Sequence, residues 1–109
     1  MSTEDYIREL KLIAHHLQEK HGEVLSQIQE PLLLVVELPN MQRAHFLIGS
    51  GRITYTENPE GAKDKVAVSY RDLMRLLEKP SKAVRYLFEG RLKVSGNYQR
   101  VLSTLQKLL

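Results

Sequence analysis

Three of the four histidines lie close together in the sequence, and they are the best candidates for metal binding: His15, His16 and His21. His15 and His16 are adjacent, so on a helix their side chains point about 100° apart. His16 and His21 are five positions apart, whereas residues three or four apart share a helix face. The chain has no Cys, and no cluster of Glu accompanies the histidines. We therefore expect exposed helix histidines, with no metal site and no cofactor.

Nucleophilic catalysis has one weak candidate, Ser50, which lies between two glycines. The G-x-S-x-G pattern of hydrolases is absent, and Gly49-Ser50-Gly51 is typical of a tight hairpin, because glycine reaches positive φ values. His45 is near in sequence, but neighbouring residues along a strand point to opposite faces. The chain also lacks a phosphate-binding loop, a dinucleotide-binding fingerprint and carboxylates paired for acid–base catalysis. The sequence thus predicts a protein that is not an enzyme.

Length and composition predict one small globular domain over residues 1–109. The chain is 42% hydrophobic and 27% charged, and its longest apolar run, Leu32 to Val36, is the size of a strand. The first residues carry acidic side chains, where a signal peptide would carry Lys or Arg before an apolar run. Together with the lack of Cys, this favours a cytoplasmic location.

Basic residues gather in the C-terminal part of the chain. Residues 70–109 hold nine Lys or Arg against three Asp or Glu, whereas residues 1–69 hold seven against ten. Such a surface suits an acidic protein, an anionic membrane or nucleic acid, although we favour the simpler explanation of solvated helix faces. Nucleic acid is disfavoured, because Phe46 and Tyr55 are the only aromatic residues that we place on strands and no helix-turn-helix pattern is present.

The hydrophobic pattern predicts helices followed by strands, then a return to helical spacing. A helix is expected over 3–21, a short one over 23–29, and strands over 32–38, 43–48, 52–57, 65–69 and 91–94. Further helices are expected after Ser69, over 81–88 with Val84, Leu87 and Phe88 facing inward, and after Asn97. This order predicts an α+β fold, in which one five-stranded, mostly antiparallel sheet is covered on one face by helices.

The stretch from Phe88 to Asn97 resembles the sterol carrier protein 2 family. Its members share an aromatic residue, a Gly two residues later, a short L-K-I/V strand, and a Gly with Asn or Asp before the last helix. The matching residues here are Phe88, Gly90, Leu92, Lys93, Val94, Gly96 and Asn97. Val66 to Ser69 with Asp72-Leu73, and Pro80 to Ala83, resemble the family's preceding elements. The resemblance covers about residues 30–109, while residues 1–22 form the N-terminal helix.

The chain also departs from many members of that family. It has no Trp, it stops at Leu109 where many members continue with a longer C-terminal segment, and it does not end in a peroxisomal targeting tripeptide. It is therefore similar to the short, stand-alone prokaryotic members. For such a member the resemblance implies a fatty acyl chain, an isoprenoid or a quinone-like lipid as ligand, rather than a sterol.

The resemblance implies a lipid-binding tunnel between the sheet and the helices. The residues that we expect to line it are Phe46, Ile48, Leu73, Met74, Leu77, Val84, Leu87, Phe88, Leu92, Val94, Tyr98, Leu102 and Leu105. The residues that we expect to meet an anionic headgroup or membrane surface are Arg71, Arg75, Lys82 and Arg85. The alternative is a protein-interaction or accessory module with a filled core and no ligand, including a homodimer.

Overall fold

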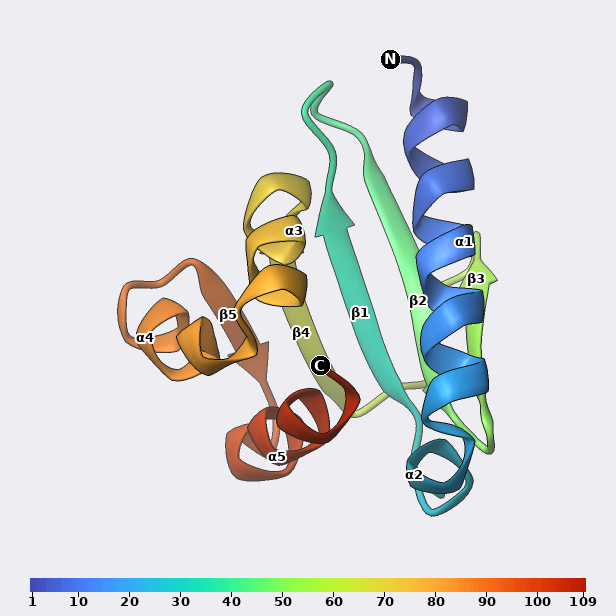
Figure 1. The fold of residues 1–109 in the computed structure, drawn as a ribbon, viewed down its shortest axis with the longest axis vertical. Helices are drawn as coiled ribbons and strands as arrows, with labels where there is room; N and C mark the ends of the chain where they lie inside the picture. The colour runs from blue at the N-terminus through green and yellow to red at the C-terminus, as the bar shows by residue number, and fades with distance from the viewer.

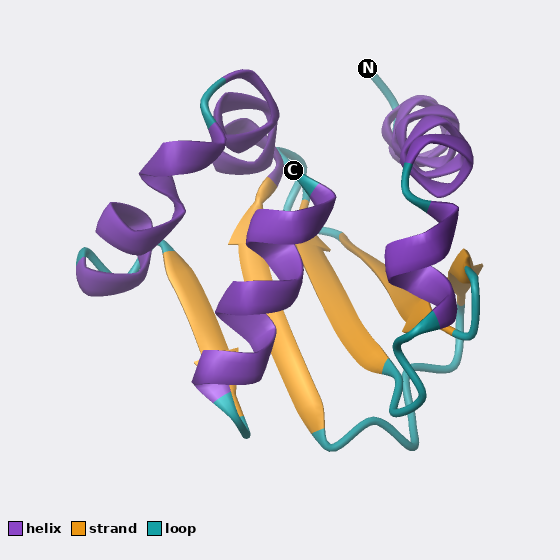
Figure 2. Ribbon diagram, turned by 60° about the horizontal axis from the view of Figure 1, so that its bottom comes forward, coloured by secondary structure: helices purple, strands orange, loops and turns teal.

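All helices of the protein lie on one face of a five-stranded sheet (Figures 1 and 2). The computed structural model describes residues 1–109. The strands are β1 (Leu32–Glu37), β2 (Arg43–Gly49), β3 (Arg52–Thr56), β4 (Asp64–Ser69) and β5 (Leu92–Ser95). The helical elements are α1 (Thr3–Lys20), α2 (Gly22–Ser26), α3 (Tyr70–Glu78), the 3-10 turn η1 (Pro80–Lys82), α4 (Ala83–Phe88) and α5 (Tyr98–Leu108). The predicted α+β class and the five strands are confirmed, and the second helix is shorter than predicted.

The strand order is β3-β2-β1-β4-β5, and the central pair, β1 and β4, is parallel. The other three pairs are antiparallel, so the sheet is mixed. Side chains alternate between its faces, and Leu34 on β1 is in register with Phe46 on one side and Val66 on the other. These three apolar residues lie in a row across the middle of the face that the helices cover.

Residues up to Thr56 form one half of the fold, and residues from Asp64 onward form the other half. The first half comprises α1, α2 and the meander β1-β2-β3, while the second comprises β4, β5 and helices α3 to α5. The two halves meet along the β1–β4 pair, and Figure 2 shows α1 on one side of this seam and α3 to α5 on the other.

Helix α1 begins with a capping box. The Ser2 hydroxyl accepts a hydrogen bond from the backbone N–H of Asp5 at 3.2 Å, and the Asp5 carboxylate accepts one from the backbone N–H of Ser2 at 3.0 Å. These bonds to Ser2 lower the pKa of Asp5. The helix then presents Leu10 and Ala14 to the core, as the helical spacing predicts.

Helix α3 is fixed to β5 by a part-buried ion pair. The Ser69 hydroxyl caps the helix by accepting from the Asp72 N–H at 3.1 Å. The Asp72 carboxylate accepts from Arg91 Nη2 at 2.6 Å and from Nε at 3.3 Å, and this guanidinium lowers the pKa of Asp72. Arg91 also lies over the Tyr86 ring, 4.0 Å from its centroid. Since Tyr86 belongs to α4, one arginine holds three elements together.

A second ion pair fixes the start of α5. The carboxylate of Asp64 accepts hydrogen bonds from the backbone N–H of Asn97, at 3.0 Å, and from the Arg100 guanidinium. These two groups hold the pKa of Asp64 below its ordinary value. Arg100 also donates to the backbone carbonyl of Glu30, just before β1. The ion pair therefore joins α5 to the beginnings of β4 and β1.

Helix α4 lies at the outer edge of the fold beside β5 (Figure 1). Its buried residues are Ala83 and Tyr86, whereas Val84 is 38% and Phe88 84% exposed. The predicted inward direction of Val84 and Phe88 is therefore wrong. A six-residue helix has room for one inward stripe, and the fully buried Tyr86 occupies it.

Candidate functional site

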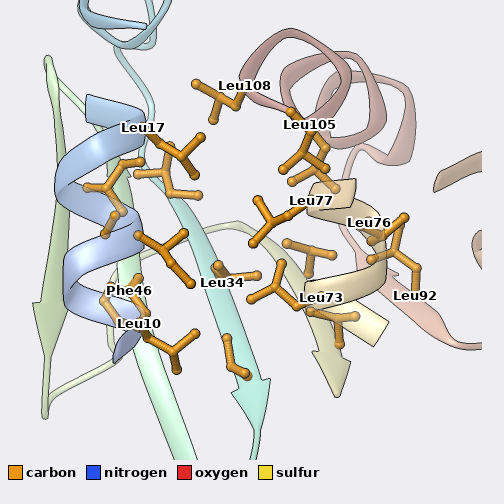
Figure 3. A pocket seen from close by; sticks show the side chains of 18 residues that line it. Leu10, Leu17, Leu34, Phe46, Leu73, Leu76, Leu77, Leu92, Leu105 and Leu108 are labelled. Atoms are coloured by element: carbon orange, nitrogen blue, oxygen red, sulfur yellow. The ribbon is translucent and has the colours of Figure 1, made fainter. Parts of the chain in front are cut away.

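An apolar cavity lies between the sheet and the helices, above the seam of the two halves (Figure 3). Its lining consists of eighteen residues, all of them hydrophobic. They are Leu10, Ile13, Ala14, Leu17, Leu34, Val36, Phe46, Ile48, Ile53, Val66, Val68, Leu73, Leu76, Leu77, Leu92, Leu105, Leu108 and Leu109. Such a lining offers dispersion contacts to a hydrocarbon and no partner for a polar group.

Two helix walls stand on either side of the cavity. Leu10, Ala14 and Leu17 of α1 follow each other at spacings of four and three, so they form one stripe that faces the cavity. The opposite wall comes from α3 and from the end of α5, which contribute Leu77 and Leu105 among others. Figure 3 shows the two sets of side chains pointing toward each other across Leu34, which lies on the floor.

The cavity holds about 60 Å³ of space that the lining leaves unfilled, and it is partly open on the side of α1 and α3. At roughly 24 cal/mol per Å³, leaving a hollow of this size empty costs at most about 1.4 kcal/mol relative to a filled one. Water gains little there, because a buried water needs two to four polar partners and this lining has none. The protein therefore carries a hollow that is lined by apolar side chains alone.

One end of the gap between α1 and α3 is closed by aromatic residues. The rings of Tyr6 on α1 and Tyr70 on α3 meet edge to face, with centroids 5.0 Å apart. Burial and a hydrogen bond with the Glu9 carboxylate raise the pKa of Tyr70 to about 12. These contacts join the first part of α1 to the beginning of α3.

Farther along α1 the gap is open. A groove of about 400 Å³ is lined there by Leu12, Ile13, His16, Leu17, Lys20, Leu77 and Leu109. Ile13, Leu17, Leu77 and Leu109 also line the cavity, so the groove lies directly outside it. We call this groove the opening. Its only polar side chains are those of His16 and Lys20.

The structure places six of the thirteen residues predicted for lipid binding in the cavity lining: Phe46, Ile48, Leu73, Leu77, Leu92 and Leu105. The other seven lie outside it: Met74, Val84, Leu87, Phe88, Val94, Tyr98 and Leu102. Three of these seven are exposed, because α4 and the first turn of α5 lie at the edge of the fold. The remaining four pack against the core away from the cavity.

The contribution of α1 and of the central strands to the cavity was not predicted from the sequence. Leu10, Ile13, Ala14 and Leu17 form a complete wall, and Leu34 and Val66 form the floor. The apolar stripe of α1 was visible in the sequence as a helix face that needs a partner. Nothing in the local pattern indicates that this face lies over the central strand, opposite α3.

The four predicted headgroup residues lie on the outer surface of the second half. Arg71, Arg75, Lys82 and Arg85 are absent from the lining of both the cavity and the opening. Arg71 and Arg75 are exposed and four residues apart, so they share one face of α3. Arg85 donates to Glu89 at 3.1 Å, which leaves its charge partly neutralised.

The candidates for reactive chemistry lie apart from the cavity. His15 pairs with Glu19 at 2.9 Å, and no group of three His, Cys, Asp or Glu side chains is placed to hold a metal ion. Ser50 occupies the β2–β3 hairpin at a φ of +53°, as a turn residue. His45 alternates with the inward-facing Ala44 and Phe46, and burial with nearby Arg43 and Lys65 lowers its pKa. None of the helices has the length and apolar character required to cross a bilayer.

Comparison with known proteins is consistent with this geometry. Three similar solved structures share 13–15% of their residues with this chain, which shows a common fold. The sterol carrier protein domain 2 of Helicoverpa armigera has a TM-score of 0.69 at 15% identity, over 93% of this chain and 85% of its own. SCP2-L2 of Aedes aegypti has a TM-score of 0.72 at 13% identity, over 92% and 97%. Palmitated SCP2L2 of the same species has a TM-score of 0.67 at 13% identity, over 99% and 95%.

No protein of curated function matches the sequence. A family model does match, over residues 10–109, and it describes the SCP-2 sterol transfer family. The matched segment begins within α1 and includes both helix walls, the whole sheet and the opening. The chain therefore belongs to the SCP-2 sterol transfer family.

Proposed function

We propose that this protein binds the hydrocarbon part of a lipid in the cavity between α1 and α3, without reacting with it, and acts as a carrier or presenting module. The observation that carries the proposal is a lining of eighteen hydrophobic residues that is continuous with a surface opening. Transfer of hydrocarbon from water into such a site gains about 0.8 kcal/mol per CH₂. Membership of the family, and the similarity to a palmitated relative, support the same conclusion.

Ligand entry requires the two helix walls to separate. The hollow of about 60 Å³ is much smaller than the pockets of roughly 300–1,000 Å³ that enclose drug-sized ligands. Helix α1 meets α3 through the Tyr6–Tyr70 contact at one end, and along the opening it faces the groove instead. We infer that this half of α1 moves outward when a ligand enters, while the sheet keeps its place.

A narrow, deformable cavity favours a flexible chain over a rigid sterol. An acyl or isoprenoid chain can thread between the aliphatic side chains of the walls and adopt the shape that they leave. A fused ring system would have to displace the floor residues as well, and these are held by strand pairing on both sides of Leu34. We therefore propose a fatty acyl chain, an isoprenoid or a related lipid as the ligand.

Native mass spectrometry of the purified protein tests this function. We expect a monomer mass together with a lipid adduct, and we expect lipid-depleted protein to regain an adduct when a fatty acid is added. A melting temperature that rises with fatty acid concentration would report the same binding by mass action. Bare chains that take up no fatty acid, or a dimer without lipid, would contradict lipid binding, and the dimer would favour the interaction module.

Basic side chains on α3 and η1 suggest where the carrier meets a membrane. We propose that Arg71, Arg75 and Lys82 contact anionic lipid, each contributing about 1 kcal/mol near such a surface. Changing all three to Gln should lower binding to vesicles that contain phosphatidylserine, measured by co-sedimentation at low salt. Fatty acid uptake in solution should not change, because none of the three lines the cavity or its opening. Equal vesicle binding by the variant and the wild type would remove this surface from the proposal.

A further inference from the structure

The polar side chains at the opening indicate which kind of lipid head the site accepts. The cavity has no polar residue, so the head of a bound amphiphile must stay in the opening, where it keeps contact with water or with a polar partner. His16 and Lys20 are the only polar side chains that line the opening. Both are hydrogen-bond donors, Lys20 carries a positive charge, and no carboxylate side chain lines the groove beside them.

The position of these two residues follows from the helical repeat of α1. Leu12, His16 and Lys20 are four residues apart, so they form one row along the helix, beside the row of Ile13 and Leu17 in the cavity wall. The other side of α1 faces β3. There the Lys11 ammonium lies 4.5 Å from the centroid of the Tyr55 ring, and the Gln18 side chain accepts from the Ile53 N–H at 2.9 Å. The row with His16 and Lys20 therefore faces the opening, away from β3.

Neither the His16 nor the Lys20 side chain helps to stabilise the fold through a polar contact. Neither side chain takes part in a side-chain hydrogen bond or an ion pair of the structure, although His15 on the same helix is paired with Glu19. A cation in the last turn of a helix also interacts favourably with the helix dipole. That role needs no particular face, whereas Lys20 lies on the face of α1 that lines the opening.

We propose that Lys20, together with His16, binds the anionic head of a single-chain amphiphile, a carboxylate or a phosphate, while the chain occupies the cavity. This inference rests on the proposed lipid-binding function. It assigns the ligand class as an anionic amphiphile and places its head between α1 and the residues Leu77 and Leu109. The basic residues of the outer surface then take no part in binding the head of the ligand in the cavity; these are Arg71, Arg75, Lys82 and Arg85.

Three ligands of equal chain length test the assignment: myristate, myristyl phosphate and myristyl alcohol. Affinities are measured by equilibrium dialysis on lipid-depleted protein. We expect Lys20→Glu to weaken binding of at least one anion about fivefold, as reversal of an exposed ion-pair partner predicts, and to change the affinity for the alcohol less than twofold. The anion whose affinity falls more in the variant identifies the head as a carboxylate or a phosphate. The matched control is Lys11→Glu, which makes the same charge change on the β3 side of α1.

The outcomes separate this inference from the proposed function. If wild-type protein binds none of the three ligands, the proposed function and this inference both fail. If it binds them all and Lys20→Glu changes no affinity, or changes all three equally, lipid binding stands and the assignment of the head is overturned. An equal loss of anion binding in Lys11→Glu would also overturn it, because the effect would then follow from net charge and not from position.

Discussion

Ala14→Leu is expected to weaken fatty acid binding strongly while the protein stays folded. Ala14 is 7% exposed and is the smallest residue of the α1 wall, so a leucine side chain there enters the hollow. We expect the affinity for myristate to fall at least about tenfold, because the chain would lose the space of several CH₂ groups at about 0.8 kcal/mol each. The melting temperature should hold or rise, since the added carbons fill space that costs at most about 1.4 kcal/mol when empty.

The control for this variant is Ala67→Leu, which adds the same carbons on the other face of the sheet. Ala67 lies between the inward-facing Val66 and Val68 on β4, and it is in register with Val35 and Lys93. Fatty acid affinity should be unchanged in this variant. If Ala14→Leu instead unfolds the protein, the site around Ala14 is fully packed, and the cavity can no longer support the proposed function.

Gly96→Ala is expected to cause the largest loss of stability among alanine substitutions at the six glycines of the chain. Gly96 has a φ of +93°, which is unfavourable for any residue with a Cβ. An added Cβ would clash with the Asp64 carboxylate and lie 2.9 Å from the carbonyl oxygen of Lys63. Relief of the clash would break the hydrogen bonds that Asp64 accepts from Asn97 and Arg100. We expect the free energy of unfolding, measured by urea denaturation, to fall by about 3 kcal/mol.

Gly61→Ala separates backbone strain from the clash. Gly61 has almost the same φ, +95°, and an added Cβ would meet no atom within 4 Å. This variant should therefore lose only the strain contribution, about 1 kcal/mol. Similar losses in the two variants would show that the close approach of Asp64 to Gly96 does not contribute, and that the ion pair does not anchor α5.

Local sequence features predicted most of the elements, because they act over a few residues. The Ser2 capping box starts α1 where the pattern indicates, and Ser50 and Gly51 form the hairpin at positive φ values of +53° and +79°. Strand alternation also predicted which residues of β2 face the core, including Phe46 and Ile48. Each of these features can be recognised without knowing what lies next to it in space.

The arrangement that makes the candidate site is nonlocal, and much of it was not predicted from the sequence. The parallel pairing of β1 with β4 joins segments about thirty residues apart, and it brings Leu34 beside Val66 on the cavity floor. That pairing also sets α1 opposite α3, so the wall containing Ala14 and Leu17 was not predicted. In α4 the apolar pattern is ambiguous, because Val84, Tyr86 and Phe88 can each fill an inward position, and only packing selects Tyr86.

The seam between the two halves has a consequence for how the chain matures during synthesis. When the meander and α1 leave the ribosome, the apolar faces of Leu10, Leu17 and Leu34 have no covering wall until β4 and α3 follow. A first half that folds at that stage exposes an open apolar groove in place of a covered cavity. We expect that a hydrocarbon or a chaperone can bind this groove at that stage. A lipid bound there would be enclosed when the second half folds onto the first, and it would not have to enter between two folded helix walls.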